Sequence, residues 1–193
     1  YVRMSGSIFL HDEDSTDKGV DILSLNKKQL LMYRPMIQMI FQDPFSSLNP
    51  RMIVKDIIQE PLNIHTKMTG PEKVKKVNWL LEKVGLSKEQ ATRYPHEFSG
   101  GQRQRLTIAR ARVLEPRFLV LDEPTSALDR TVQLQIIELL LRLQHEHGLA
   151  YLFISHDLRV VRALADELVV LKEGLVVESG PARELFETPR QSY

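Results

Sequence analysis

The stretch from residue 98 to residue 129, FSGGQRQRLTIARARVLEPRFLVLDEPTSALD, constrains the fold more than any other part of the sequence. It joins a glycine-rich turn to a helical pattern, and then an apolar run to a pair of acids. A glycine-rich turn at a helix start favours anions, and acids at a strand end favour cations. We therefore expect a site for a phosphate chain and a metal ion in this stretch.

The apolar run is Phe118–Leu121, which lacks any polar alternation and so predicts a strand covered on both faces within a parallel sheet. Asp122 and Glu123 follow at once, and Pro124 ends the strand. Two carboxylates beside a buried strand are costly unless a cation meets them. Asp122 is a candidate Mg²⁺ ligand, directly or through water, and Glu123 is a candidate base for a water molecule. Taken alone, the pair also fits an ordinary solvated strand exit.

The glycine-rich turn comprises Ser99, Gly100, Gly101 and Gln102. Glycines let a backbone approach a ligand without hindrance from Cβ atoms. Apolar residues at helical spacing follow over residues 104–113, which places the turn at a helix N-terminus, where free N–H groups favour an anion. Ser99 can donate its hydroxyl to such an anion, or can serve only as the N-cap of the helix.

Together these motifs resemble the nucleotide-binding domain of ABC transporters. Ser99–Gln102 is similar to the signature motif, and Phe118–Glu123 is similar to the Walker B strand with its catalytic Glu. Three further matches follow in the family's order: Gln42 (the Q-loop glutamine), Ser126–Asp129 (the D-loop) and His156 (the switch histidine). The resemblance runs from about Gly6 to the C-terminus, and five motifs in order make it specific.

The resemblance implies an α/β fold of the P-loop NTPase type, with a mostly parallel sheet and an inserted helical subdomain. We expect one ABC domain over residues 1–193, with the subdomain at about 52–112. Periodicity agrees with alternating elements. Strands are predicted at 1–10, 36–41, 151–154, 168–171 and 176–178, and helices at 25–33, 54–62, 71–84, 131–147 and 158–164. In such a sheet Gln42, Asp122 and His156 would lie at C-terminal strand ends, where ligands bind.

The resemblance also implies roles for the residues. Two nucleotide-binding domains would enclose two ATP molecules head to tail, with Ser99–Gln102 reaching the nucleotide of the other domain. Glu123 would polarise the attacking water, and His156 would contact the γ-phosphate. Gln42 would sense Mg²⁺ and water and link the site to membrane subunits. Asp129 would cross the dimer interface.

Two segments narrow the resemblance to importers of oligopeptides, dipeptides and nickel. Residues 41–52, FQDPFSSLNPRM, are similar to their Q-loop region, and residues 184–193 are similar to the tail after their core domain. In the tail, Gln191 and Ser192 replace the usual His-Pro. The implied function is an ATP-binding subunit that couples ATP hydrolysis to uptake of peptides or similar solutes, at the cytoplasmic face of the inner membrane. Its partners would be permease subunits, a second nucleotide-binding domain and, indirectly, an extracytoplasmic solute-binding protein.

One expected motif is missing, because no GxxxxGK[ST] phosphate loop occurs in the 193 residues. In the family this loop precedes the first strand-and-helix unit, so we interpret the chain as an N-terminally truncated fragment that lacks the first strand and the phosphate loop. We expect that the chain alone binds MgATP poorly and does not hydrolyse it. The alternatives are a catalytically silent interaction module, or a soluble ABC ATPase of translation or DNA repair.

Composition excludes several other classes. With 26 basic and 25 acidic residues, the formal net charge is +1, which gives no broad field for nucleic acid. The run of Arg103, Arg105, Arg110 and Arg112 fits a solvated, salt-bridged helix face. No cysteine is present, which excludes a disulfide framework. The histidines outside the motifs lack metal-site spacing, and the single Trp79 is interpreted as subdomain packing.

Overall fold

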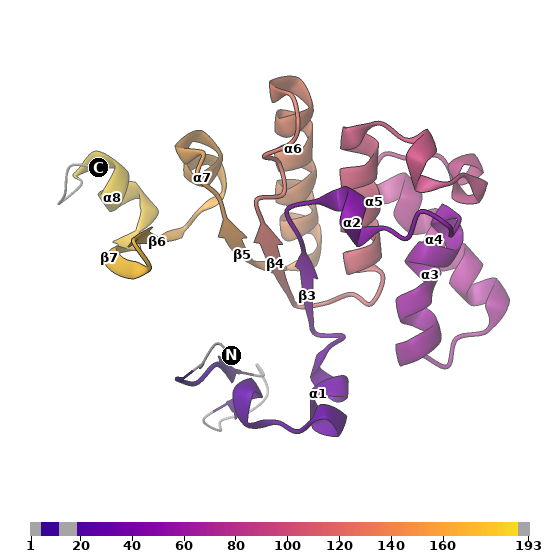
Figure 1. The fold of residues 1–193 in the computed structure, drawn as a ribbon, viewed down its shortest axis with the longest axis horizontal. Helices are drawn as coiled ribbons and strands as arrows, with labels where there is room; N and C mark the ends of the chain where they lie inside the picture. The colour runs from indigo at the N-terminus through magenta and orange to yellow at the C-terminus, as the bar shows by residue number, and fades with distance from the viewer. Residues whose placement is uncertain (1–4, 12–18, 189–193) are drawn as a thin grey trace.

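The computed structural model describes residues 5–11 and 19–188. At its centre lies a three-stranded parallel sheet in the order β3-β4-β5, built from β3 (Ile37–Ile40), β4 (Phe118–Asp122) and β5 (Ala150–Ile154) (Figure 1). The register pairs Ile40 with Leu121 and Leu121 with Phe153, so the strands end almost level. The residues that follow all three strands therefore meet at one edge of the sheet.

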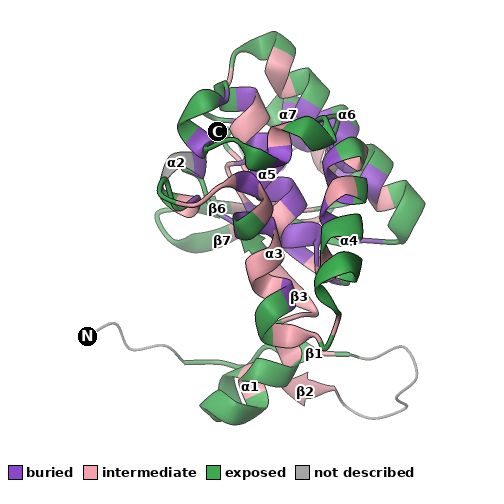
Figure 2. Ribbon diagram, turned by 90° about the vertical axis from the view of Figure 1, so that its right-hand side faces the viewer, coloured by how far each residue is buried: buried purple, intermediate pink, exposed green. Residues whose placement is uncertain are grey.

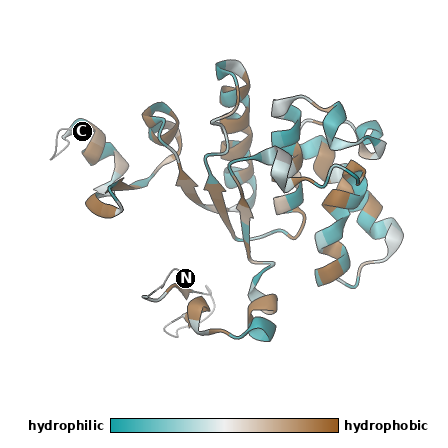
Figure 3. Ribbon diagram, in the orientation of Figure 1, coloured by the Kyte–Doolittle hydropathy of each residue, from teal (hydrophilic) through white to brown (hydrophobic). Residues whose placement is uncertain are grey.

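One face of this sheet is packed against helices and the other is open. Leu119 and Leu121 are fully buried, and Ile40, Tyr151 and Phe153 belong to or pack against the same core. On the opposite face Leu152 and other apolar side chains are largely exposed, in register with Val120. Figure 3 shows β3, β4 and β5 mostly in the brown of hydrophobic residues. As predicted, Phe118–Leu121 forms the middle strand of a parallel sheet, but only one of its faces is fully covered in the described residues, because Phe118 and Val120 are half-buried.

The covered face meets α6 (Arg130–His147), whose ends are fixed by its sequence. Asp129 caps the first turn, and Gly148 ends the helix with the left-handed φ of +61° that glycine adopts without strain. The predicted face is buried from Ile136 to Leu143, and the Tyr151 hydroxyl donates to the Leu140 carbonyl at 2.9 Å. This bond holds β5 against α6.

The segment between β3 and β4 is helical throughout. It contains α2 (Pro44–Ser47), α3 (Val54–His65), α4 (Gly70–Lys83), α5 (Gly100–Arg112) and the short 3₁₀ helices η2 (Lys88–Thr92) and η3 (Pro95–Glu97). Figure 2 shows the buried residues concentrated in this group and in α6. Helix α5 packs against β3, α2, α3 and α6, so it joins the helical group to the sheet.

Two details of α3 and α4 differ from the sequence prediction. Helix α3 continues through Pro61 to His65, although the sequence placed Pro61 near its end. On α4, Val77, Leu80 and Leu81 are buried, whereas Val74 is 37% exposed and Trp79, which was interpreted as subdomain packing, is 40% exposed. Trp79 lies edge-on to a histidine ring at the end of α6 instead of inside the subdomain.

The remaining elements flank this centre (Figure 1). The N-terminal ones are β1 (Phe9–Leu10), β2 (Val20–Asp21), η1 (Ile22–Ser24) and α1 (Lys27–Tyr33), and the C-terminal ones are α7 (Leu158–Leu164), β6 (Glu167–Lys172), β7 (Leu175–Pro181) and α8 (Ala182–Glu187). Strands β1 and β2 pair antiparallel, as do β6 and β7. Of the predicted strand at 1–10, the described part is strand only at Phe9–Leu10, and residues 1–4 and 189–193 lie outside the described residues.

Candidate functional site

The candidate site is the edge of the sheet where β3, β4 and β5 end. Gln42 lies two residues beyond β3, Asp122 and Glu123 end β4, and His156 lies two residues beyond β5. Because the strands are parallel and in register, three segments distant in sequence deliver these side chains to one place. The prediction that Gln42, Asp122 and His156 lie at C-terminal strand ends is confirmed.

Glu123 is the centre of this cluster, and each of its carboxylate oxygens has a partner. The Gln42 amide Nε2 donates to Oε2 at 3.0 Å, and His156 Nδ1 lies 2.9 Å from Oε1. A carboxylate only accepts hydrogen bonds, so Nδ1 of His156 carries the hydrogen in this contact. The Glu123 side chain is 23% exposed, whereas His156 is 74% exposed. The carboxylate is therefore held in a defined orientation and still reaches solvent.

The backbone at Glu123 is unusual. Its φ of +43° lies in the left-handed region, which costs a non-glycine residue of the order of 1 kcal/mol. The Glu123 amide donates to the Ile154 carbonyl at 2.9 Å, which extends the ladder between β4 and β5 by one bond. The amide and the hydroxyl of Ser126 both donate to the Glu123 carbonyl. These bonds hold the turn that aims the carboxylate toward Gln42 and His156.

The expected metal ligands offer hard oxygen donors. Asp122 ends β4 with a half-buried side chain, and Gln42 uses its nitrogen toward Glu123, which leaves its carbonyl oxygen for another partner. Among the described residues no group of three or more His, Cys, Asp or Glu side chains could enclose a metal. Mg²⁺ typically takes one or two protein ligands, with water and phosphates completing the shell, so this donor set fits it.

The signature turn is a capped helix N-terminus, as the sequence predicts. The Ser99 hydroxyl accepts from the Gln102 amide at 3.3 Å, and the Gln102 side chain accepts from the Ser99 amide at 3.0 Å. This reciprocal pair is a capping box, which fixes the first turn of α5. Ser99 can therefore serve both as the N-cap and as a donor to an anion, because a hydroxyl that accepts a capping bond still has its own hydrogen to donate.

The second glycine of the turn is required by packing. A Cβ on Gly101 would lie 2.3 Å from Cγ1 of Val132, in the first turn of α6. A Cβ on Gly100 would meet only Leu128, at an ordinary 3.5 Å. The start of α5 is therefore pressed against the start of α6. Asp129, the predicted interface residue, accepts from the amides of Thr131 and Val132 and so caps α6 within this chain.

The prediction of a solvated, salt-bridged arginine face on α5 is confirmed only in part, because Arg110 pairs with Glu60 but none of the four arginines is exposed. Arg103 and Arg105 donate to the carbonyls of Pro95 and Val84, and Arg110 donates to the carbonyl of Ser47. Arg112 is only 3% exposed, and burial lowers the pKa of its guanidinium. Arg103, Arg105 and Arg110 thus hold loops and helix ends of the helical group against α5. Helical spacing alone cannot distinguish arginines that bind backbone carbonyls from arginines on a solvated face.

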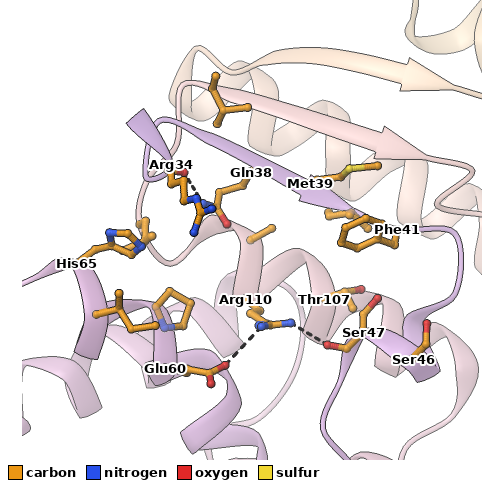
Figure 4. Close-up of a pocket in the computed structure, with 16 residues that line it drawn as sticks. Arg34, Gln38, Met39, Phe41, Ser46, Ser47, Glu60, His65, Thr107 and Arg110 are labelled. Atoms are coloured by element: carbon orange, nitrogen blue, oxygen red, sulfur yellow. Dashed lines mark hydrogen bonds and ion pairs between the residues drawn. The ribbon is translucent and has the colours of Figure 1, made fainter. Parts of the chain in front are cut away.

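A cleft of about 740 Å³ lies between β3 and the helices α3 and α5 (Figure 4). Phe41 and Met39 line the sheet side, and Arg110 lies on the helix side between Ser47 and Glu60. The sequence analysis placed Arg110 only on a solvated, salt-bridged helix face and Ser47 only within residues 41–52, and it did not single out Glu60. Their contact joins positions 50 and 63 residues apart, and no local pattern signals it.

Comparisons with known proteins agree with this arrangement. The family model described as ABC transporter matches residues 2–126, and the chain belongs to that family. Among solved structures, the cassette MJ0796 bound to ADP and Pi superposes with a TM-score of 0.75 at 29% identity, over 86% of this chain and 72% of that one. CbiO1 of Clostridium perfringens gives a TM-score of 0.74 at 32% identity, over 84% and 63%. The fold is that of an ABC ATPase cassette.

The curated relatives of the chain are named as transport or import proteins. It is 55% identical to the peptidoglycan transport ATP-binding protein YejF of Agrobacterium fabrum, over 91% of this chain and 32% of that protein. It is 53% identical to the oligopeptide transport ATP-binding protein OppF of Bacillus subtilis, over 87% and 55%, and 53% identical to the glutathione import protein GsiA of Escherichia coli O157:H7, over 90% and 28%. The chain thus spans between 28% and 55% of these relatives' lengths.

Proposed function

We propose that this chain is the hydrolytic part of an ATP-binding subunit that drives uptake of peptides or similar solutes. The observation that carries the proposal is the Glu123 carboxylate, held by Gln42 and His156 at the level ends of three parallel strands. A carboxylate fixed in orientation and open to solvent is suited to accept a proton from water. The names of the relatives, which refer to oligopeptide, glutathione and peptidoglycan transport, support the cargo class.

The proposed roles follow the chemistry of each side chain. Glu123 accepts the proton of the attacking water, and Gln42 and His156 keep its carboxylate in place. With hydrogens on both ring nitrogens, His156 would also donate from Nε2 to developing charge on the γ-phosphate. Asp122 and the Gln42 carbonyl oxygen would hold Mg²⁺, which would offset negative charge on the phosphates of ATP. The phosphate cradle itself would be provided by a GxxxxGK[ST] loop, which these 193 residues do not contain.

The signature turn is proposed to act on the nucleotide of a second domain. Its first turn is rigid and capped, and its backbone N–H groups suit an anion. Asp129, which caps α6 beside it, would lie at the interface between the two domains. One of the solved relatives is described as a dimeric ABC transporter cassette, which supports an assembly of two such domains. We further propose that residues 52–112 form the helical subdomain of a single domain.

Membrane association is proposed to come from partners. Among the described residues no helix is long and apolar enough to cross a bilayer. The relatives are named as transport proteins, so we place the chain at the cytoplasmic face of the membrane, bound to permease subunits, with a solute-binding protein on the other side. The cleft is lined by Phe41, the residue before Gln42, and lies between the sheet and the helices. A permease subunit bound there would contact both the sheet and the helical group.

A second candidate is a catalytically silent interaction module, which these 193 residues permit because they contain no phosphate loop. The test is ATP hydrolysis by a protein that carries this chain together with a phosphate loop. The proposed function expects Mg²⁺-dependent turnover that supports uptake of a labelled peptide by vesicles containing the permease. Absence of both nucleotide binding and turnover would favour the silent module.

A further inference from the structure

Arg110 connects the helix of the signature turn to the segment after Gln42, which lies 63 residues away in sequence at Ser47. It projects from α5, the helix that begins with the signature turn. Its Nη1 donates to the Ser47 carbonyl at 2.7 Å, and its Nη2 lies 3.4 Å from the Glu60 carboxylate of α3 (Figure 4). The side chain is 36% exposed, so the fork is partly withdrawn from water. A guanidinium offers such paired donors in a fixed geometry.

The Ser47 end of this contact leads directly to Gln42. Helix α2, which Ser47 ends, begins two residues after Gln42. The hydroxyls of Ser46 and Ser47 donate to the Asp43 carbonyl at 3.1 Å and 2.8 Å. The turn between Gln42 and Ser47 is therefore cross-braced, and a shift of Ser47 moves Asp43 and its neighbour. The Gln42 amide in turn holds Oε2 of Glu123.

The helix end of the contact leads to the signature turn. Gly101 lies nine residues before Arg110, about 14 Å along a helix that rises 1.5 Å per residue. It is pressed against Val132 without room for a Cβ. Helix α5 is thus fixed at its start by α6, and Arg110 uses it as a support for the Gln42 segment. The two motifs are therefore linked by hydrogen bonds through Asp43, Ser47 and Arg110, together with the backbone of α5 and the peptide bond between Gln42 and Asp43.

We propose that Arg110 is a positioning residue of the hydrolytic site, which sets the place of Gln42, and through it of Glu123, relative to the signature helix. The inference rests on the proposed function. Arg110 touches neither nucleotide nor water in this assignment, and acts only through the Ser47 carbonyl. Loss of the contact would let Gln42 drift from Glu123 while the substrate-binding surfaces stay intact.

The test uses a full-length protein that contains this chain and a phosphate loop. In Arg110→Gln we expect kcat for ATP to fall about tenfold with KM changed less than about twofold, because misplacement near a site lowers the rate of the chemical step. Arg110→Lys, which keeps the charge but not the fork, should lie between. In a Gln42→Ala background, Arg110→Gln should lower kcat little further, because both changes act through one contact.

The matched control is Arg142→Gln, which also removes an arginine bond to a backbone carbonyl, that of Lys83, away from Gln42. It should leave kcat unchanged at a similar loss of thermal stability. Amide hydrogen exchange over residues 42–52 should quicken in Arg110→Gln only. An unchanged kcat, equal losses in both backgrounds, or unchanged exchange would overturn the inference. If the unaltered protein hydrolysed no ATP, both the proposed function and the role of Arg110 in hydrolysis would be contradicted. Amide hydrogen exchange would still show whether the bond from Arg110 to Ser47 holds residues 42–52 in place.

Discussion

The strand-end cluster and the signature turn are both small polar sites, but they are built in opposite ways. In the cluster, Gln42 and His156 reach Glu123 from 81 and 33 residues away in sequence. In the turn, Ser99 and Gln102 satisfy each other across three residues. The cluster therefore depends on the order and register of three strands, whereas the capping box of the turn needs only the first residues of one helix.

The difference teaches where each site is vulnerable. A local capping box survives small movements of its surroundings, because its donors and acceptors move with it. A cluster of three strand ends is lost if any strand shifts by one residue, because side chains alternate between faces. The signature turn has one long-range demand of its own, the contact of Gly101 with Val132. Substitutions at the strand-end cluster and at the signature turn should therefore have different effects.

The largest effect is expected at the centre of the cluster. In a protein that carries this chain with a phosphate loop, Glu123→Gln should lower kcat by about 10²–10⁴-fold, because an amide cannot accept the proton of water. The amide oxygen can still accept from Gln42, so thermal stability should change little. The measurement is steady-state ATPase activity. Glu173→Gln is the matched control, because Glu173 also has a positive φ, of 52°, but lies in the turn between β6 and β7. Equal activity of both variants would remove Glu123 from its role.

The turn should be most sensitive at Gly101. Gly101→Ala places a Cβ against Val132 and should lower the free energy of unfolding by about 1–3 kcal/mol, as overpacking does. Gly100→Ala, with its 3.5 Å contact, should cost clearly less. Urea unfolding of the three proteins gives the comparison. Val132→Ala combined with Gly101→Ala should recover part of the loss, and no recovery would mean that the contact does not set the cost.

A smaller effect is expected from the anchor of β5, the strand that leads to His156. Burial raises the pKa of the Tyr151 phenol from 10.0 to about 12. The folded state therefore favours the neutral phenol, and its contribution to stability is present below pH 10 and lost as pH rises toward 12. Tyr151→Phe should remove this part of the alkaline loss, and at neutral pH should cost about 1 kcal/mol for the bond to Leu140. Unfolding curves from pH 8 to about pH 11 are the measurement. An identical pH dependence in both proteins would argue against the buried phenol.

The smallest effect is expected at Asp129. Asp129→Ala removes the acceptor for two amides at the start of α6 and should cost about 1 kcal/mol of unfolding free energy. Asp157→Ala, which removes the cap of α7, is the matched control and should cost a similar amount. If Asp129 also lies at a domain interface, as proposed, only Asp129→Ala should weaken dimerisation, measured by sedimentation. Equal dimerisation of both variants would leave Asp129 as a cap alone.

Much of the fold could be predicted from local patterns. The spacing of apolar residues gave α6 almost to the residue, and Gly85 and Gly148 mark helix ends at positive φ as expected. The capped turn at Ser99 followed from residue types three positions apart. The apolar run at 118–121 does not by itself predict the open face of the sheet, because the run is the same whether or not Leu152 beside it is covered. Sheet coverage depends on which segments arrive in space.

The candidate site was predictable in membership but not in geometry. Motif order identified Gln42, Glu123 and His156, yet nothing local states that both carboxylate oxygens of Glu123 are occupied. The arginines of α5 show the same limit. Their spacing predicts a shared face, but their partners are carbonyls such as that of Ser47, which any residue could supply. Backbone acceptors leave no trace in side-chain patterns.

The central claim is that Gln42 and His156 act on one carboxylate. A double-mutant cycle on kcat tests it most directly, with Gln42→Ala, His156→Ala and the combination in a protein that contains a phosphate loop. We expect kcat of the double variant to fall far less than the product of the two single losses. Either change alone already releases the Glu123 carboxylate from its fixed orientation, so the second change has little left to remove. Losses that multiply independently would contradict it.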